Sequence, residues 1–100
     1  YLADAATAID GGRTLVWEAA WARSLCKPVN KLAPMAKLFA CRTAEYVSSK
    51  AIEIFGGNGF TREYPVEKYF RDQKVGHIYE GTSNMQLVVI AKQILGKMTR

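Results

Sequence analysis

The sequence predicts an all-α protein, an antiparallel helical bundle with two long helices, one short helix and a closing helix. Two observations carry this prediction. Apolar and small residues recur at intervals of three and four over most of the chain, which places them on one face of a helix. No stretch of useful length alternates apolar and polar residues, so we expect no sheet. The 100 residues make at most one small domain.

The first helix is expected to run from about Leu2 to about Leu25. Its apolar or small residues share one face at this spacing: Leu2, Ala5, Ile9, Gly12, Val16 and Ala19. The pair Gly11-Gly12 lies in the middle of the segment, although a glycine inside a helix costs roughly 1 kcal/mol relative to alanine. The pair is expected either to allow close approach of a neighbouring helix or to mark a kink.

A second helix is expected from about Ala33 to Phe55, after a break at Pro28, which disfavours helix at the residue before it. Asn30 is an acceptable helix cap, and Pro34 fits the first turn, where a missing N–H does no harm. Small residues form a stripe along this helix that favours close packing against neighbours: Ala33, Ala36, Ala40, Ala44, Val47, Ala51 and Ile54.

The run Gly56-Gly57-Asn58-Gly59 is expected to end the second helix, because glycine tolerates the positive φ of a helix end. By itself the run is typical of a cap and turn. Its functional interpretation is close approach of backbone to a nucleotide or its phosphates. It follows a helix and no strand, which excludes the dinucleotide-binding GxGxxG turn, and it lacks the Lys-Ser/Thr of a P-loop. Pro65 then opens a brief helix from Val66 to Asp72.

The last helix is expected to begin after Gly81, with Thr82 or Ser83 as its cap. Gly96 is the expected terminator. Three cations suit the negative end of the helix dipole: Lys92, Lys97 and Arg100.

Composition and charge narrow the function classes. The hydrophobic fraction of 49% is typical of a globular protein and too high for disorder. No apolar run approaches the roughly 18 residues that cross a bilayer, so no membrane span is expected. The net charge of +5 comes from cations that are spread along the chain without forming a cluster. Solvated helix faces are therefore favoured over a nucleic-acid-binding patch.

The two cysteines, Cys26 and Cys41, form no CxxC pair and have no partners at metal-ligand spacing. They can form one disulfide, or they can serve as small buried hydrophobic residues, which is the commoner role in an intracellular chain. His77 is the single histidine and cannot complete a zinc site with them alone. No metal site is expected.

The run Tyr79-Glu80-Gly81-Thr82 places a carboxylate just before a helix N-terminus, where the helix dipole and free N–H groups favour its anionic form. Gly81 leaves room for a ligand to approach the backbone. By itself this pattern is more typical of a helix-entry turn than of a catalytic acid.

Taken together, these motifs resemble the C-terminal helical domain of the flavin-dependent acyl-CoA dehydrogenases. The similar blocks occur in the family's order and at its spacing: Ala36-Lys37-Leu38-Phe39-Ala40, Ala51 through Phe60, Tyr64-Pro65-Val66-Glu67-Lys68, Phe70-Arg71-Asp72, and Ile78 through Asn84. The resemblance covers nearly the whole chain and is strongest from Lys37 to Ala91. Within the family, the chain is most similar to the short- and branched-chain or butyryl-CoA types. The resemblance implies that residues 1–100 are a C-terminal domain within a longer enzyme, whose other domains supply the flavin ring pocket and most of the CoA site.

The resemblance also implies an oxidoreductase that removes two hydrogens from the α and β carbons of an acyl-CoA thioester. Glu80 stands at the position of the base that takes the α proton, while the β hydrogen leaves as hydride to the flavin of FAD. The backbone N–H of Glu80 and a ribityl hydroxyl of FAD would bind the thioester oxygen and stabilise the developing enolate. Tyr79 would line the acyl pocket, and Gly81 would lie against the substrate.

Two sets of FAD contacts follow from the same resemblance. One set lies at the start of the last helix: Thr82, Ser83 and Asn84. The other would meet the adenosine-diphosphate end of FAD bound to a neighbouring subunit: Glu53, Ile54, Phe55, Gly56 and Gly57. One cofactor would then bridge two chains, which implies a homo-oligomer, either a dimer or a tetramer. Many relatives carry Gln in place of Glu53 and of Asn84, so these two contacts depart from the family pattern.

The implied partners are the acyl-CoA substrate and electron-transfer flavoprotein, and the implied location is the cytoplasm of a bacterium or the mitochondrial matrix of a eukaryote. We expect the isolated 100 residues to bind FAD weakly or not at all and to turn over nothing. One alternative is a non-catalytic helical module that self-associates through its Ala-rich face and through Trp17 and Trp21, which share a helix face as core or interface residues. Another is a basic helical nucleic-acid binder.

Overall fold

A computed structural model describes residues 1–96 of the chain. Its helices, in chain order, are α1 (Leu2–Ser24), α2 (Leu32–Phe55), η1 (Gly56–Phe60), α3 (Val66–Gln73), η2 (Lys74–His77) and α4 (Ser83–Leu95), where η1 and η2 are short 3₁₀ helices. No strand occurs in this part of the chain, and the prediction of an all-α fold is confirmed. None of the described helices combines the length and the apolar character that a bilayer crossing requires. The expected cations Lys97 and Arg100 lie outside the described residues.

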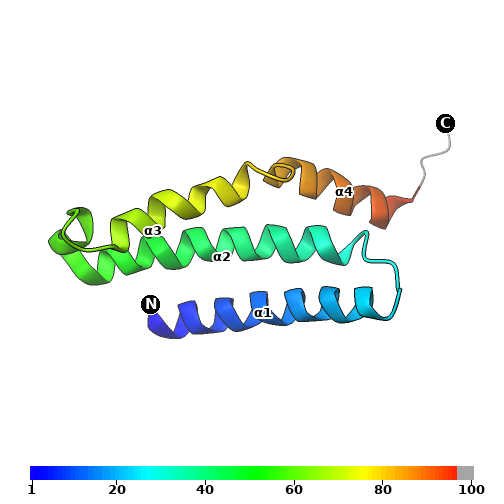
Figure 1. The fold of residues 1–100 in the computed structure, drawn as a ribbon, viewed down its shortest axis with the longest axis horizontal. Coiled ribbons are helices and arrows are strands. Elements are labelled where there is room, and N and C mark those ends of the chain that lie inside the picture. The colour runs from blue at the N-terminus through cyan, green and yellow to red at the C-terminus, as the bar shows by residue number, and fades with distance from the viewer. Residues whose placement is uncertain (97–100) are drawn as a thin grey trace.

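The long helix α2 lies at the centre of the structure (Figure 1). Helix α1 runs antiparallel along one of its sides, and α3, η2 and α4 follow one another along the opposite side. The structure measures 54 × 29 × 19 Å and has a radius of gyration of 16.3 Å, against about 13 Å for a compact domain of this length. The antiparallel bundle is therefore an elongated layer, and α2 is the element against which the other helices pack.

The hydrophobic core of this layer is small. Within residues 1–96, the buried hydrophobic side chains are Ala22, Ala36, Leu38 and Val66. Trp17 and Trp21 are 66% and 64% exposed, so they are not core residues of this chain, and their alternative role at an interface remains a prediction. Both indoles stay exposed because α1 packs against α2 along one face and leaves its other faces uncovered.

The glycine pair of α1 allows close helix packing. Helix α1 continues through Gly11 and Gly12 without a break. The Phe39 ring of α2 lies against both glycines, and a Cβ atom at either position would stand 3.5 Å from that ring. The interpretation as a close approach is therefore confirmed, and the alternative of a kink is not needed.

The start of α2 differs from the prediction. Its N-cap residue is Lys31, no side chain caps the helix, and the expected cap at Asn30 is wrong. Backbone carbonyls of the preceding turn satisfy the first donors instead, since Ala33 N donates to Val29 O at 2.9 Å and Met35 N donates to Lys31 O at 3.2 Å. The residue between them is a proline without an N–H, so the first turn has little need of a side-chain cap.

The two cysteines are free and lie in different environments. Cys26 is exposed in the turn after α1 with φ +55°, so the prediction of a buried hydrophobic residue is wrong for this position. Cys41 is half-buried on α2, and its Sγ donates to the carbonyl oxygen of Gly76 at 3.1 Å. This contact lies in η2, an element that the sequence pattern did not predict.

The stripe of small residues on α2 lies only partly beneath another helix. Ala36 is buried, but further along α2 the stripe lines an apolar groove of about 450 Å³ between α1, α2 and α3. The groove is lined by Ile9, Gly12, Ala40, Thr43, Ala44, Val47, Ser48, Ala51, Val66, Tyr69 and Gln73. The expected close packing is therefore realised near the start of α2, and the middle of the helix keeps an open apolar face.

Candidate active site

The Glu80 turn, residues 78–82, connects η2 to α4. Glu80 has φ +52° and Gly81 has φ +88°, so two consecutive residues adopt the left-handed conformation. Glycine adopts this conformation readily, but for other residues it costs about 1–2 kcal/mol. A conformation of this kind persists where neighbouring groups hold it in place.

Side chains from α2 and α4 hold the turn through three consecutive carbonyl groups. Lys37 Nζ, on α2, donates to the carbonyl oxygen of Tyr79 at 2.7 Å and to that of Gly81 at 2.5 Å. The same ammonium group lies 5.6 Å from the centroid of the Tyr79 ring. Gln86 Nε2, on α4, donates to the carbonyl oxygens of Glu80 at 3.3 Å and Gly81 at 3.1 Å. Within residues 1–96, no backbone N–H donates to these three carbonyls, so tertiary contacts fix the turn.

The reactive groups of Glu80 are unoccupied by protein partners. Its side chain is exposed and makes no ion pair or hydrogen bond with any residue that the structure describes. Its backbone N–H also has no acceptor among those residues. Carboxylate and N–H are therefore both available to a molecule that approaches the turn.

The first turn of α4 presents further donors beside Glu80. Thr82 Oγ1 accepts a hydrogen bond from Met85 N at 3.3 Å, so the prediction of a cap at this position is confirmed for Thr82. The backbone N–H groups of Thr82, Ser83 and Asn84 have no acceptor in the described part of the chain. Free N–H groups at the start of a helix bind anionic or polar oxygen atoms of a ligand.

A polar network behind the turn is absent from the sequence prediction. A hydrogen bond of 2.7 Å joins Ser83 Oγ to His77 Nδ1. His77 Nε2 lies 3.2 Å from Glu45 Oε2, although the two groups are not aligned as a hydrogen bond. Lys74 Nζ donates to Glu45 Oε1, and this bond lowers the pKa of Glu45 below its ordinary value. The network joins α2, η2 and the start of α4, and no local sequence pattern reveals such a juxtaposition.

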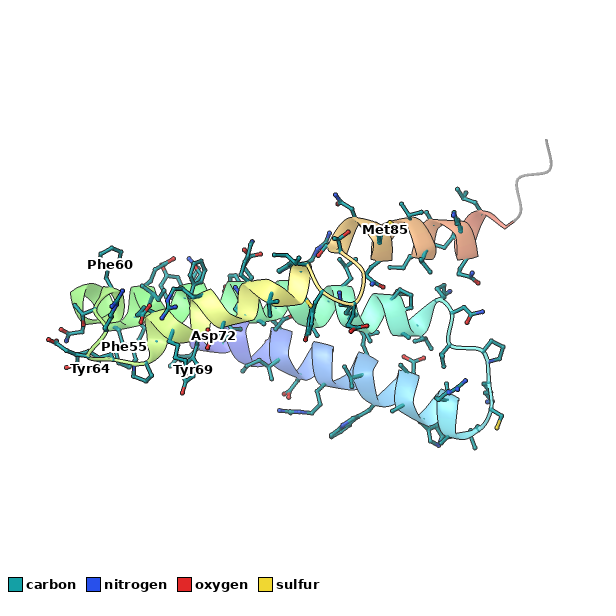
Figure 2. The ribbon with its side chains drawn as sticks, turned by 45° about the horizontal axis from the view of Figure 1, so that its top comes forward. Phe55, Phe60, Tyr64, Tyr69, Asp72 and Met85 are labelled. Carbon is teal, nitrogen blue, oxygen red and sulfur yellow. The ribbon has the colours of Figure 1, made fainter. Side chains whose placement is uncertain are left out.

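The second set of predicted cofactor contacts lies at the far end of α2. The carboxylate of Glu53 accepts hydrogen bonds from Lys50 Nζ at 2.9 Å on both oxygens, and these bonds lower the pKa of Glu53. Ile54 and Phe55 are exposed. The Phe55 ring packs edge-on against Tyr64, with centroids 5.7 Å apart (Figure 2). The end of α2 thus presents apolar side chains to solvent and a carboxylate already paired with a cation.

The glycine run forms η1. Gly56 caps the C-terminus of α2 with φ +60°, so the predicted end of this helix is confirmed. A Cβ atom at Gly56 or Gly57 would meet no atom within 4 Å, and their backbone is therefore open to approach. Gly59 is the opposite case, because a Cβ atom there would lie 2.5 Å from the carbonyl oxygen of Ile52. Internal packing explains the glycine at Gly59, whereas it does not explain the other two.

The Glu80 turn and the glycine run lie far apart on the same chain. The turn attaches to α2 at Lys37, and the run begins after Phe55, about 27 Å further along the helix at the usual rise per residue. Figure 2 shows Phe55 and Phe60 at one end of the molecule, well away from Met85 at the start of α4. The structure therefore does not bring the two predicted sets of cofactor contacts together at one point.

Two grooves of the described part of the chain lie away from Glu80. The large apolar groove lies between α1, α2 and α3, and a smaller groove of about 260 Å³ lies between α1, α2 and α4. Neither groove is lined by a residue of the Glu80 turn. In residues 1–96, no group of three His, Cys, Asp or Glu side chains could hold a metal ion. The Glu80 turn thus presents an acid and hydrogen-bond donors at a place that neither groove reaches.

Comparison with known proteins gives concordant results. Residues 1–95 match the family described as "Acyl-CoA dehydrogenase, C-terminal domain". The chain is 52% identical over 93 residues to a probable short/branched chain specific acyl-CoA dehydrogenase of Dictyostelium discoideum, covering 93% of this chain and 22% of that protein. It is 50% identical over 93 residues to the mitochondrial short/branched chain specific acyl-CoA dehydrogenase of Rattus norvegicus, with the same coverage. The structure of butyryl-CoA dehydrogenase from Megasphaera elsdenii superposes with a TM-score of 0.92 at 41% identity, over 94% of this chain and 24% of that one. The chain therefore spans about a quarter of the length of the relatives it matches. These relatives are of the short/branched-chain and butyryl-CoA types, which the sequence motifs had indicated.

Proposed function

Because the chain belongs to the acyl-CoA dehydrogenase family, we propose that it is the C-terminal helical domain of a longer FAD-dependent enzyme that oxidises acyl-CoA thioesters at the α and β carbons. The share of its relatives that it spans supports this role. The small core and the extensive exposed apolar surface also support it, since such surface is typical of an interaction site. On this proposal the domain covers residues 1–100.

Glu80 is the catalytic base of the proposed reaction, and the observation that carries this assignment is its free carboxylate at the entrance to α4. The carboxylate takes the α proton of the substrate. The backbone N–H of Glu80 donates to the thioester oxygen and stabilises the negative charge that develops there. FAD, when bound, supplies the acceptor for the hydride that leaves the β carbon. Tyr79 and Gly81 flank the base and contact the acyl chain and the thioester.

The residues present fit contacts to FAD at both predicted places. The free N–H groups of Thr82, Ser83 and Asn84 suit polar oxygens of the cofactor, and the open backbone at Gly56 and Gly57 suits its phosphates. Because about 27 Å of α2 separates the two places, each chain serves one cofactor with its Glu80 turn and a neighbouring chain's cofactor with its glycine run. This arrangement requires a homo-oligomer.

The proposed physiological partner is electron-transfer flavoprotein, which takes up the electrons after each turnover. The proposed location is the mitochondrial matrix in a eukaryote, as for the mitochondrial relative from rat, or the cytoplasm in a bacterium. The isolated domain is expected to bind FAD weakly or not at all. A purified sample of residues 1–100 that is yellow, or that reduces a dye with acyl-CoA, would contradict this expectation.

The test of the assignment is Glu80→Gln in the full-length protein that carries this domain. The amide keeps the shape of the side chain and removes its basicity. We expect the variant to retain the absorbance of bound FAD and to lose both turnover and bleaching of the flavin by short-chain acyl-CoA. Glu63→Gln, at an exposed glutamate outside the site, is the matched control and should leave activity unchanged. Near-normal turnover of Glu80→Gln would remove Glu80 from its role.

A further inference from the structure

In the described part of the chain, backbone hydrogen bonds do not hold the left-handed conformation of the turn that contains Glu80, the proposed base. Glu80 and Gly81 both have positive φ, and the carbonyls of residues 79–81 receive no backbone donor within residues 1–96. The nearest backbone hydrogen bonds lie on either side, from Tyr79 N to Val75 O and from Gln86 N to Thr82 O. A segment with this pattern would relax to a lower-energy backbone unless side chains held it.

The ammonium of Lys37 contributes the two shorter contacts to this segment. Its Nζ bridges the carbonyls of Tyr79 and Gly81, at 2.7 and 2.5 Å, and these carbonyls flank that of Glu80. Lys37 has no carboxylate partner in the described part of the chain, so its charge is directed at these carbonyls and at the Tyr79 ring. Hydrogen bonds from a charged donor are shorter and stronger than those from a neutral one.

We propose that Lys37 is a positioning residue for the reaction: from α2 it holds the Glu80 turn in its left-handed conformation and thereby fixes where the Glu80 carboxylate and N–H stand relative to the substrate. Gln86 assists through the longer contacts on the other side of the turn. The inference rests on the proposed role of Glu80. It assigns a catalytic consequence to a lysine whose observed contacts are with the backbone and the Tyr79 ring of the turn.

The chemistry of the side chain explains why a lysine serves here. A single Nζ atom carries three donors and can reach two carbonyl oxygens at once. The guanidinium of arginine presents its donors in a rigid planar fork, which matches two oxygens of one carboxylate better than two carbonyls on either side of a turn. Methionine has a similar length and no donor. Lys37→Arg therefore keeps the positive charge but weakens the bridge between the two carbonyls, whereas Lys37→Met removes both the charge and the hydrogen bonds.

The experiment uses the full-length protein with FAD bound. In Lys37→Met we expect the flavin absorbance and KM to stay near those of the wild type while kcat falls about 10- to 100-fold, the scale of loss for a misplacement of about 1 Å. Hydrogen exchange should become faster in peptides that cover residues 78–86 and stay unchanged in those that cover residues 66–73. Lys68→Met, at an exposed lysine of α3, is the matched control and should alter neither quantity.

A double-mutant cycle tests whether Lys37 acts through Glu80. In the Glu80→Gln background, Lys37→Met should cause a smaller further loss than it does in the wild type, because the carboxylate is no longer a base and only the backbone N–H of residue 80 remains to be positioned. A further loss of the same size as in the wild type would overturn the inference. If Lys37→Met yields no folded protein, Lys37→Arg carries the test, with an expected loss in kcat of about threefold or more and the same local rise in exchange.

Two outcomes distinguish the inference from the proposed function. If Glu80→Gln keeps its turnover, the assignment of the base fails, whatever Lys37 does. If Glu80→Gln is inactive but Lys37→Met and Lys37→Arg both leave kcat and local exchange unchanged, the assignment of the base stands and the positioning role of Lys37 is wrong.

Discussion

Replacement of Gly81 by alanine should destabilise the Glu80 turn in two ways, through its backbone conformation and through a steric clash. Gly81 has φ +88°, a conformation that L side chains rarely adopt. Its added Cβ atom would also stand 2.8 Å from Nε2 of Gln86. The Gln86 amide would have to move, and it would lose its hydrogen bonds to the carbonyls of Glu80 and Gly81.

The expected magnitude follows from these two effects. The left-handed conformation costs a non-glycine residue about 1–2 kcal/mol. Loss of two hydrogen bonds from a neutral side chain adds about 1 kcal/mol for each, reduced where water replaces the lost partner. The sum is about 2–4 kcal/mol. Gly96→Ala is the matched control, because Gly96 has φ +72° and no atom within 4 Å of the added Cβ, so only the conformational cost of about 1–2 kcal/mol applies.

The assay compares denaturant unfolding and acyl-CoA turnover for both variants of the full-length protein. We expect Gly81→Ala to be less stable than Gly96→Ala and to lose most of its kcat, while Gly96→Ala keeps its kcat. Equal stability of the two variants, together with normal turnover of Gly81→Ala, would show that neither the conformation of Gly81 nor the Gln86 contacts matter for the turn.

Two further predictions concern other parts of the fold. Gly59→Ala should destabilise the junction of α2 and η1 by about 1–3 kcal/mol through overpacking against the carbonyl oxygen of Ile52, as measured by thermal unfolding, and an unchanged melting temperature would contradict the close contact. The hydrogen bond from Lys74 lowers the pKa of Glu45, so the ion pair should stabilise the fold at neutral pH and lose this contribution as the pH falls through and below 4.5. Because both side chains are partly exposed, the ion pair should contribute about 0.5 kcal/mol to the free energy of unfolding. The test compares the stability of the wild type with that of Glu45→Gln at pH 7 and at pH 3. The same difference at both pH values would refute the prediction.

Local signals in the sequence were sufficient to predict α1, α2, α3 and α4 and most of their ends. The spacing of apolar residues predicted α1, α2 and α4, and the glycines at Gly56 and Gly96 predicted the ends of two of them. A cap at Thr82 or Ser83 was predicted because a hydroxyl before a helix satisfies its first donors, and Thr82 is the cap in the structure. These features depend on residues within a few positions of one another.

Other features were not predicted, several of them because they depend on residues that are distant in the sequence. Asn30 failed as a cap because the carbonyls of the preceding turn were already in place. Cys26 was expected inside, but α1 ends before it and the layer leaves that turn exposed. The contacts of Lys37 with the Glu80 turn and of Glu45 with His77 join segments that are far apart in the chain, and only the packing of η2 and α4 on α2 brings them together. The family resemblance suggested Glu80 as the proposed base but did not indicate which side chains hold its turn.

The length of α2 that separates the Glu80 turn from the glycine run would have a genetic consequence in the proposed enzyme. If one chain lends its glycine run to a neighbour's cofactor, then damage at Glu80 and damage at Gly56 fall on different catalytic units of an assembled oligomer. A mixed assembly of two inactive variants, one altered at each position, would contain one unit with both defects and another with neither. Co-expression of two null alleles would therefore restore part of the activity.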